Sequence, residues 1–333
     1  MRKIMMVLAC ALTLAGCAEL HLTQETTDVF LQVGSVKDTP PAQDYAGHFA
    51  TYAAMAAKAY EAVDDQGRVI GKPRDFGSAN QKVRALLSDW TYVTGDYGPL
   101  CPGGGHQCSI IQGLEYQVWA SRPRKDGACQ TVALVFRGTD ANSLGDWLSD
   151  LHWIIRLTPL NDQYEQVQQQ TQEIIDRKIK TLRCFRKDTQ IVSVGHSLGG
   201  GLAQQAAYMS RDIRKVYAFD PSVVTGALDP HSNLAQTRAG LEIERIYEHG
   251  EILAFPRLLV RSVLENSPCN PQIRVARFNL AEGSPVSQHS IVDLAAHLAM
   301  ITDKQRRPKP LPKPKPEDLR DCSAAGTPAK PPA

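Results

Sequence analysis

The sequence predicts an α/β layered fold, in which helices cover both faces of a mostly parallel sheet. Short apolar runs rich in β-branched residues alternate with segments of helical periodicity that are ten or more residues long. Such an alternation is what parallel strands joined by crossover helices require. The 333-residue chain is 43% hydrophobic and 22% charged, a composition typical of globular proteins and unlike collagen, coiled coils or wholly disordered chains.

Four segments have the 3.6-residue apolar periodicity of helices that lie on a sheet. In the second segment the repeating residues Tyr164, Val167, Thr171 and Ile174 fall on one helix face. The predicted helices span residues 44–63, 161–182, 197–211 and 287–300.

The predicted strands are short runs that read as buried or half-buried. The first two flank residues 122–127 and are candidates for a hairpin, whereas the later ones are separated by helices or long connections. The predicted strands span residues 116–120, 131–136, 190–194, 214–219, 242–247 and 272–278.

The first 16 residues have the pattern of an export signal. Two basic residues precede an apolar stretch of 11 residues, 4–14. This stretch is too short to span a bilayer and typical of the apolar region of a secretory signal. The four residues at the end of this stretch, Leu-Ala-Gly-Cys at 14–17, resemble the lipobox of bacterial lipoproteins.

The lipobox resemblance implies cleavage before Cys17 and lipidation of its thiol, which would anchor the protein in the membrane. Two or more acyl chains anchor a protein stably, whereas one is marginal. Ala18, in place of an aspartate, favours the outer membrane of the bacterial cell envelope. The alternatives are an ordinary signal peptide, or Cys10 as the acceptor, although cleavage there leaves only six apolar residues.

Six further cysteines, an even number in an exported chain, predict disulfides. Two of them flank a glycine-rich loop, and two others each lie just upstream of a predicted strand and meet at one sheet edge if those strands are parallel neighbours. The spacing contains no Cys-x-x-Cys pair, so we expect no metal. The loop pair is Cys101 and Cys108, the strand pair Cys129 and Cys184, and the others are Cys269 and Cys322.

The formal charge of +2 is too small to create the positive potential that binds nucleic acid, and we expect no nucleic-acid partner. The sum hides an acidic body, residues 17–303, with 27 basic and 32 acidic side chains.

Residues 304–333 carry 8 basic and 3 acidic side chains, and 8 of the 21 prolines. Alternate prolines over 308–316 predict an extended polyproline II segment. We interpret this tail as a solvated terminus stapled by Cys322, or as a basic spacer toward anionic headgroups or cell wall.

The strongest chemical motif is Gly-His-Ser-Leu-Gly at 195–199. An apolar predicted strand leads into it and a small-residue helix leaves it, which is the context of a serine nucleophile on a sharp turn. Gly195 and Gly199 allow the strand and helix to approach at that turn. A phosphate-binding turn would favour a lysine where the chain has Leu202. Ser197 is therefore the candidate nucleophile.

With this motif, residues 45–300 resemble the class 3 lipases, the fungal triacylglycerol lipase type within the α/β-hydrolases. Val-Phe-Arg-Gly-Thr-Asp at 135–140 resembles the family's oxyanion strand and turn, and Asp-Trp-Leu-Ser-Asp at 146–150 resembles its next block. The resemblance implies that Thr139 and the backbone N–H of Leu198 stabilise the oxyanion. It also places a lid over residues 141–160.

A serine nucleophile needs a base and an acid that orients it. His289 follows the last predicted strand, where this fold places the base, and His297 is the alternative. Residues 245–252 resemble the strand end that carries the acid, which implies Glu251 where the family usually has aspartate. Asp220 and Glu248 stay open as alternative acids.

The resulting organisation is a signal peptide over 1–16, a tether over 17–43, a class 3 lipase-like α/β-hydrolase domain over 44–303 and a Pro/Lys-rich tail over 304–333. The expected function is hydrolysis of lipid esters through an acyl-enzyme, as a triacylglycerol lipase or a phospholipase, without a cofactor. The alternatives are an acyltransferase on the same site and a catalytically silent envelope lipoprotein that acts as an interaction module.

Overall fold

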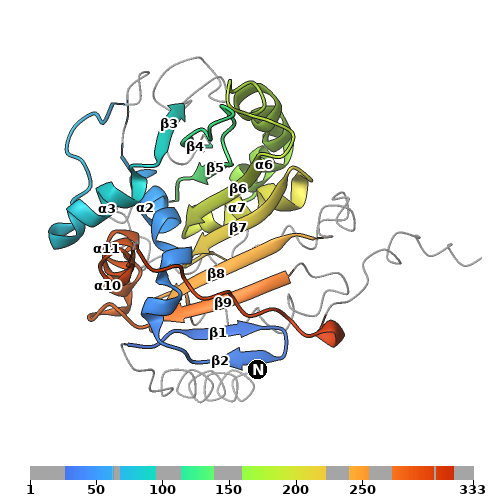
Figure 1. Cartoon of the computed structure of the whole chain (residues 1–333). Coiled ribbons are helices and arrows are strands. Elements are labelled where there is room, and N and C mark those ends of the chain that lie inside the picture. Colours follow the sequence, from blue (N-terminus) through green and yellow to red (C-terminus); the bar gives the residue numbers. More distant parts are fainter. Residues whose placement is uncertain are drawn as a thin grey trace, which may run out of the picture.

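The computed structural model describes residues 27–61, 63, 68–94, 114–138, 160–222, 240–254, 272–303 and 305–318. Within these ranges nine strands form one sheet in the order β2-β1-β9-β8-β7-β6-β5-β4-β3 (Figure 1). The strands are β1 (Phe30–Val33), β2 (Val36–Asp38), β3 (Trp90–Thr94), β4 (Tyr116–Ser121), β5 (Thr131–Phe136), β6 (Gln190–His196), β7 (Ile213–Phe219), β8 (Glu242–Glu248) and β9 (Gln272–Phe278).

The centre of the sheet is parallel and both of its sides end in antiparallel pairs. Strands β5 to β9 pair in parallel, while β3, β4 and β5 are antiparallel neighbours. The hairpin expected across residues 122–127 is thus formed, by β4 and β5. The predicted α/β-hydrolase-like class, a mostly parallel sheet with helices on both faces, is confirmed.

The two faces of the sheet carry separate cores, which explains the continuous apolar run of β5. Val132, Leu134 and Phe136 point into one core, whereas Ala133 and Val135 point into the other. A strand covered on both faces must be apolar at every position, because successive side chains alternate between the faces.

Helices of different character cover the two faces. On one face pack α2 (Ala50–Lys58), α3 (Asn80–Leu87) and α11 (Ile291–Ile301), and on the other pack α6 (Leu160–Ile174) and α7 (Leu198–Met209) (Figure 1). The helix α2 contributes mainly alanines to its core, so it lies close to the sheet.

Two predicted helices are interrupted in the structure. The expected helix over 44–63 consists of two short 3₁₀ turns followed by α2, and the backbone at Tyr45, between the two turns, is not helical (φ −122°, ψ −19°). The ring of Phe49, which directly precedes α2, packs edge-on against Phe278. The expected helix over 287–300 is split into α10 (Pro285–Gln288) and α11, which Ser290 caps. His289 lies at the break between them.

The sheet extends into the residues expected to form a tether. The strand β1 pairs antiparallel with β9, and β2 pairs with β1. Leu31 and Val33 are buried by this pairing. A four-residue strand gives too short an alternation to be recognised in the sequence, which is why the expected boundary at residue 44 missed it.

Residues 305–318, called here the C-terminal strap, are largely exposed, as expected for a solvated terminus, but hydrogen bonds tie them to the domain. Figure 1 shows this segment crossing α2 toward β1. The Lys309 N–H donates to the carbonyl of Asp44 (2.8 Å), and its carbonyl accepts from His48 Nε2 (2.7 Å). Further along, Arg274 Nε donates to the carbonyl of Pro312 (2.9 Å). Hydrogen bonds from the strap backbone to both 3₁₀ turns and to β9 therefore hold the proline-rich segment in place.

Cys129 and Cys184 form a disulfide, with Cα atoms 5.0 Å apart. They lie just before β5 and β6, which are parallel neighbours as the expected pairing required. Cys10, Cys17 and the remaining four cysteines lie outside the described residues. In the part of the chain that the structure describes, no helix has the length and apolarity needed to cross a membrane.

Candidate active site

Ser197 occupies the sharp turn between β6 and α7, with φ 55° and ψ −123°. Only one other described non-glycine residue, Asp220, has a positive φ. Hydrogen bonds hold the strained turn on both sides: Ser197 N–H donates to the carbonyl of Phe219 (2.9 Å), and Ser222 N–H donates to the carbonyl of Ser197 (3.0 Å). Such strain persists only where the surroundings impose it, and it commonly marks functional residues.

The glycines beside Ser197 allow strand and helix to meet at this turn. A Cβ on Gly195 would overlap the carbonyl oxygen of Gly199, and one on Gly199 would overlap the carbonyl oxygen of Phe136. Both obstructing atoms belong to the backbone, which cannot move aside as a flexible side chain would. The packing therefore gives these two glycines the mechanical role expected from the motif.

His289 and Glu251 form a fully buried hydrogen-bonded pair. The His289 Nδ1 to Glu251 Oε2 distance is 2.7 Å, and both side chains are 0% exposed. The same carboxylate oxygen accepts the N–H of Leu253 (2.8 Å). Because the carboxylate accepts from Nδ1–H, Nε2 is the basic nitrogen of the neutral imidazole ring.

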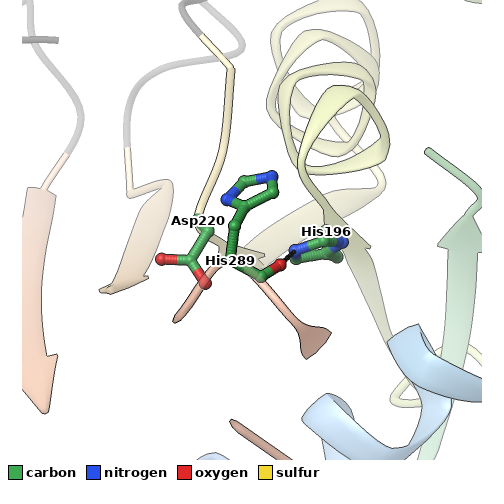
Figure 2. A group of neighbouring side chains, drawn as sticks. All are labelled: His196, Asp220 and His289. Atoms are coloured by element: carbon green, nitrogen blue, oxygen red, sulfur yellow. Dashed lines mark hydrogen bonds between the residues drawn. The ribbon is translucent and has the colours of Figure 1, made fainter. Parts of the chain in front are cut away.

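The base candidate lies at the edge of the sheet where β6 ends. The rings of His196 and His289 have centroids 4.7 Å apart, and His196 Nε2 is 3.0 Å from the carbonyl oxygen of His289. Figure 2 shows His289 and Asp220 beside His196, the residue that directly precedes Ser197. The structure thus brings the His289–Glu251 pair next to His196, the residue before the candidate nucleophile.

The two alternative acids lie in the same corner but make different contacts. Asp220 is fully buried, and its Oδ1 accepts the N–H of Glu248 (3.0 Å). The Oε1 atom of Glu248 accepts the N–H groups of Leu280 (2.6 Å) and Ala281 (3.1 Å), so this carboxylate fastens the loop that precedes α10. Burial raises the pKa of Glu248 to about 7.

The base candidate His289 is hydrogen-bonded to Glu251, and the two alternative acids are placed differently. A carboxylate oxygen of Asp220 lies within 4.8 Å of a ring nitrogen of His289 and of His196. The carboxylate of Glu248 instead accepts hydrogen bonds from the backbone of the loop before α10. The other base candidate, His297, lies within α11 and not at the break that carries His289.

His196, Asp220 and His289 form a buried group that resembles a metal site by residue type. The hydrogen bonds of His196 do not fit this role. Its Nε2 donates to the carbonyl of His289, because a carbonyl only accepts, and its Nδ1 is 2.9 Å from the hydroxyl of Tyr60. With both ring nitrogens engaged, His196 has no lone pair directed at a metal, and these residues do not fit one.

The oxyanion stabilisers are only partly described. Leu198 is the first residue of α7, so its N–H directly follows the nucleophile. Thr139 and residues 141–159, which include nearly all of the expected lid, lie outside the described residues.

Two residues of the site were not expected from the sequence. The sequence analysis assigned no function to His196, and its ring contacts the main chain of His289. Tyr60 carried no chemical signal at all, since it fits the apolar stripe of a helix. A side chain that bonds a distant backbone carbonyl leaves no spacing in the sequence by which it could be found.

One family model and several solved structures are similar to parts of this chain. Residues 104–220, which include Ser197, match the family described as a Tle-like phospholipase domain. No curated protein sequence matches the chain. Among solved structures, lipase II from Rhizopus niveus is 20% identical with a TM-score of 0.41 and covers 65% of this chain and 76% of its own. An esterase from Pyrobaculum calidifontis is 12% identical with a TM-score of 0.33 and covers 67% of this chain and 90% of its own. Residues 104–220 are thus phospholipase-like in sequence, within an α/β-hydrolase-like fold.

Proposed function

We propose that this protein is a serine carboxylester hydrolase that acts on lipid esters through an acyl-enzyme. The observation that carries the proposal is the buried Glu251–His289 hydrogen bond of 2.7 Å, at the sheet edge where Ser197 sits on a strained turn. A base oriented by a carboxylate beside a serine on such a turn is the arrangement that nucleophilic ester cleavage requires.

In the proposed reaction, Ser197 Oγ attacks the ester carbonyl while His289 Nε2 takes the hydroxyl proton. The N–H of Leu198 and the donors of Thr139 stabilise the oxyanion, and each donor in such a site is worth about 2.7–4 kcal/mol. His289 then gives its proton to the leaving alcohol, so that the C–O bond breaks and the acyl group stays on Ser197. Water repeats the sequence and releases the fatty acid.

Glu251 is the proposed acid because its carboxylate touches His289 Nδ1. It fixes the tautomer and stabilises the imidazolium that forms during attack. Changing the acid to an amide disrupts that tautomer, so we expect Glu251→Gln to lower kcat by about 10⁴-fold. Asp220→Asn should cause a smaller loss, and the opposite order of the two losses would make Asp220 the acid.

Among lipid esters, the match of residues 104–220 to a phospholipase domain favours phospholipids over triacylglycerols as substrate. Release of fatty acid from phospholipid vesicles and from a triacylglycerol emulsion distinguishes the two. Glycerol added to the vesicle assay tests for an acyltransferase, because acyl transfer to glycerol in place of water would replace hydrolysis by esterification.

Labelling with a fluorophosphonate probe tests the nucleophile. We expect the wild type to be labelled and Ser197→Ala not to be. Ser210→Ala is a matched control, because Ser210 lies at the other end of α7 and bonds Gln172 outside the site. Absence of Ser197-dependent labelling would rule out both enzyme hypotheses and favour the catalytically silent lipoprotein.

We also propose that a lipid on Cys17 anchors the protein in the bacterial cell envelope, at the outer membrane. The support is the resemblance of residues 14–17 to a lipobox after an 11-residue apolar stretch. Cys17→Ser should move the protein from the membrane to the soluble fraction. Unchanged fractionation of this variant would contradict the lipid anchor.

A further inference from the structure

We propose that Tyr60 and His196 form a positioning pair that holds the main chain of His289 and thereby places its ring for Ser197. The inference rests on the proposed role of His289 as the base. It adds two residues that do not touch the reacting atoms and act through a hydrogen-bond chain that runs from the Tyr60 hydroxyl through the His196 ring to the His289 carbonyl.

The direction of both hydrogen bonds follows from the group that ends the series, the carbonyl of His289. The carbonyl oxygen of His289 can only accept, so the hydrogen is on His196 Nε2, 3.0 Å away. In a neutral imidazole Nδ1 is then an acceptor, so the Tyr60 hydroxyl, 2.9 Å away, must donate. Burial above all, and then the neighbouring His289, keep the pKa of His196 well below its ordinary value, so the ring stays neutral. One tautomer therefore satisfies all three groups.

Tyr60 is held firmly enough to fix the His196 ring. The two rings meet edge-on, with centroids 5.9 Å apart. The guanidinium groups of Arg74 and Arg137 lie 5.6 and 5.8 Å from the centroid of the Tyr60 ring, and Arg137 is paired with Glu115 (2.7 Å). Such cation–π contacts favour one orientation of the aromatic ring.

The location of His289 explains why it needs this support. His289 lies at the break between α10 and α11, so no continuous helix fixes its backbone. Glu251 fixes only the Nδ1 side of the ring. The bond from His196 fixes the backbone of the base relative to the residue just before the nucleophile, which couples the positions of His289 and Ser197.

Displacements of about 1 Å in a catalytic group can cost about 100-fold in rate. Tyr60→Phe removes the donor to His196 Nδ1 and keeps the ring. We expect it to lower kcat and the rate of fluorophosphonate labelling by about 10- to 100-fold, with KM changed less than twofold. Tyr52→Phe is the matched control, because Tyr52 is a tyrosine of α2 that stacks on Tyr217 away from the site.

A double-variant cycle tests whether Tyr60 acts through His196. If it does, Tyr60→Phe should have no further effect in the His196→Leu background, and independent losses that multiply would overturn the proposal. His196→Gln, whose amide N–H can reach the carbonyl of His289, should retain more activity than His196→Leu. Equal losses in these two variants would also count against the proposal.

A spectroscopic readout separates this proposal from the proposed function. The buried proton between His289 Nδ1 and Glu251 should give a far-downfield proton NMR signal, which we expect Tyr60→Phe to shift or broaden and Tyr52→Phe to leave unchanged. If wild type is not labelled at Ser197, the proposed function fails, while the NMR comparison still decides the positioning pair. If wild type is labelled but Tyr60→Phe equals Tyr52→Phe in rate and spectrum, the positioning pair alone is refuted.

Discussion

Replacing Glu248 by glutamine should make the protein more stable at alkaline pH. The carboxyl group of Glu248 is buried at the end of β8, and its Oε1 accepts two backbone N–H groups, from Leu280 and Ala281. A glutamine carbonyl oxygen can accept the same two hydrogen bonds without a charge. The substitution therefore keeps the loop contacts and removes the charge whose burial becomes costly at alkaline pH.

The size of the effect follows from the pKa of this group. Burial raises the pKa of Glu248 from an ordinary value of 4.5 to about 7. Between these values the folded protein binds a proton that the unfolded chain does not, so stability is highest below pH 4.5 and falls as the pH rises through 7. At 1.36 kcal/mol for each pH unit of difference, wild type loses about 3 kcal/mol across this window and Glu248→Gln does not.

Urea unfolding at pH 5 and pH 8 measures the difference. We expect Glu248→Gln to gain up to about 3 kcal/mol relative to wild type between the two pH values. Glu242→Gln is the matched control, because Glu242 lies on the same strand, 41% exposed and paired with Lys215, and should follow the wild type. A Glu248→Gln protein that loses stability relative to wild type on going from pH 5 to pH 8 would refute the reasoning.

Three further predictions concern the frame of the site. Gly195→Ala should destabilise the protein by more than about 2 kcal/mol and abolish esterase activity, because the new methyl group would overlap backbone of α7; a Tm equal to that of wild type would contradict this. Replacing both Cys129 and Cys184 by alanine should lower the free energy of unfolding by about 4 kcal/mol, because the disulfide closes a loop of 55 residues; urea unfolding measures this loss. Reduction of this disulfide in the wild type should cause the same loss. Asp44→Asn should speed tryptic cleavage at the Arg306–Arg307 bond of the C-terminal strap, since the carboxylate pairs with Arg306 (2.7 Å) and Lys309 (2.7 Å), and an unchanged cleavage rate would show that these ion pairs do not hold the strap.

The sequence was sufficient for the parts of the fold that depend on local pattern. The β-rich run 131–136 predicted a short strand, and the structure divides its apolar side chains between two cores. The motif at 195–199 predicted a strand, a sharp turn and a helix, and Ser197 has the positive φ of that turn. Short or irregular elements gave no such pattern: β1 is four residues long, and the strap is held by backbone bonds that no periodicity reveals.

What the sequence determined by itself is thus the layered α/β class, the nucleophile turn and the candidates for base and acid, because each depends on neighbours in the chain. Only the tertiary structure decided which carboxylate contacts His289. Glu251, Glu248 and Asp220 lie at or just after the ends of the neighbouring parallel strands β7 and β8, and their burial and partners depend on residues far away in the chain. The role of the Tyr60–His196 pair is of the same kind, since 136 residues separate its two members and the contact exists only once α2 packs on the sheet.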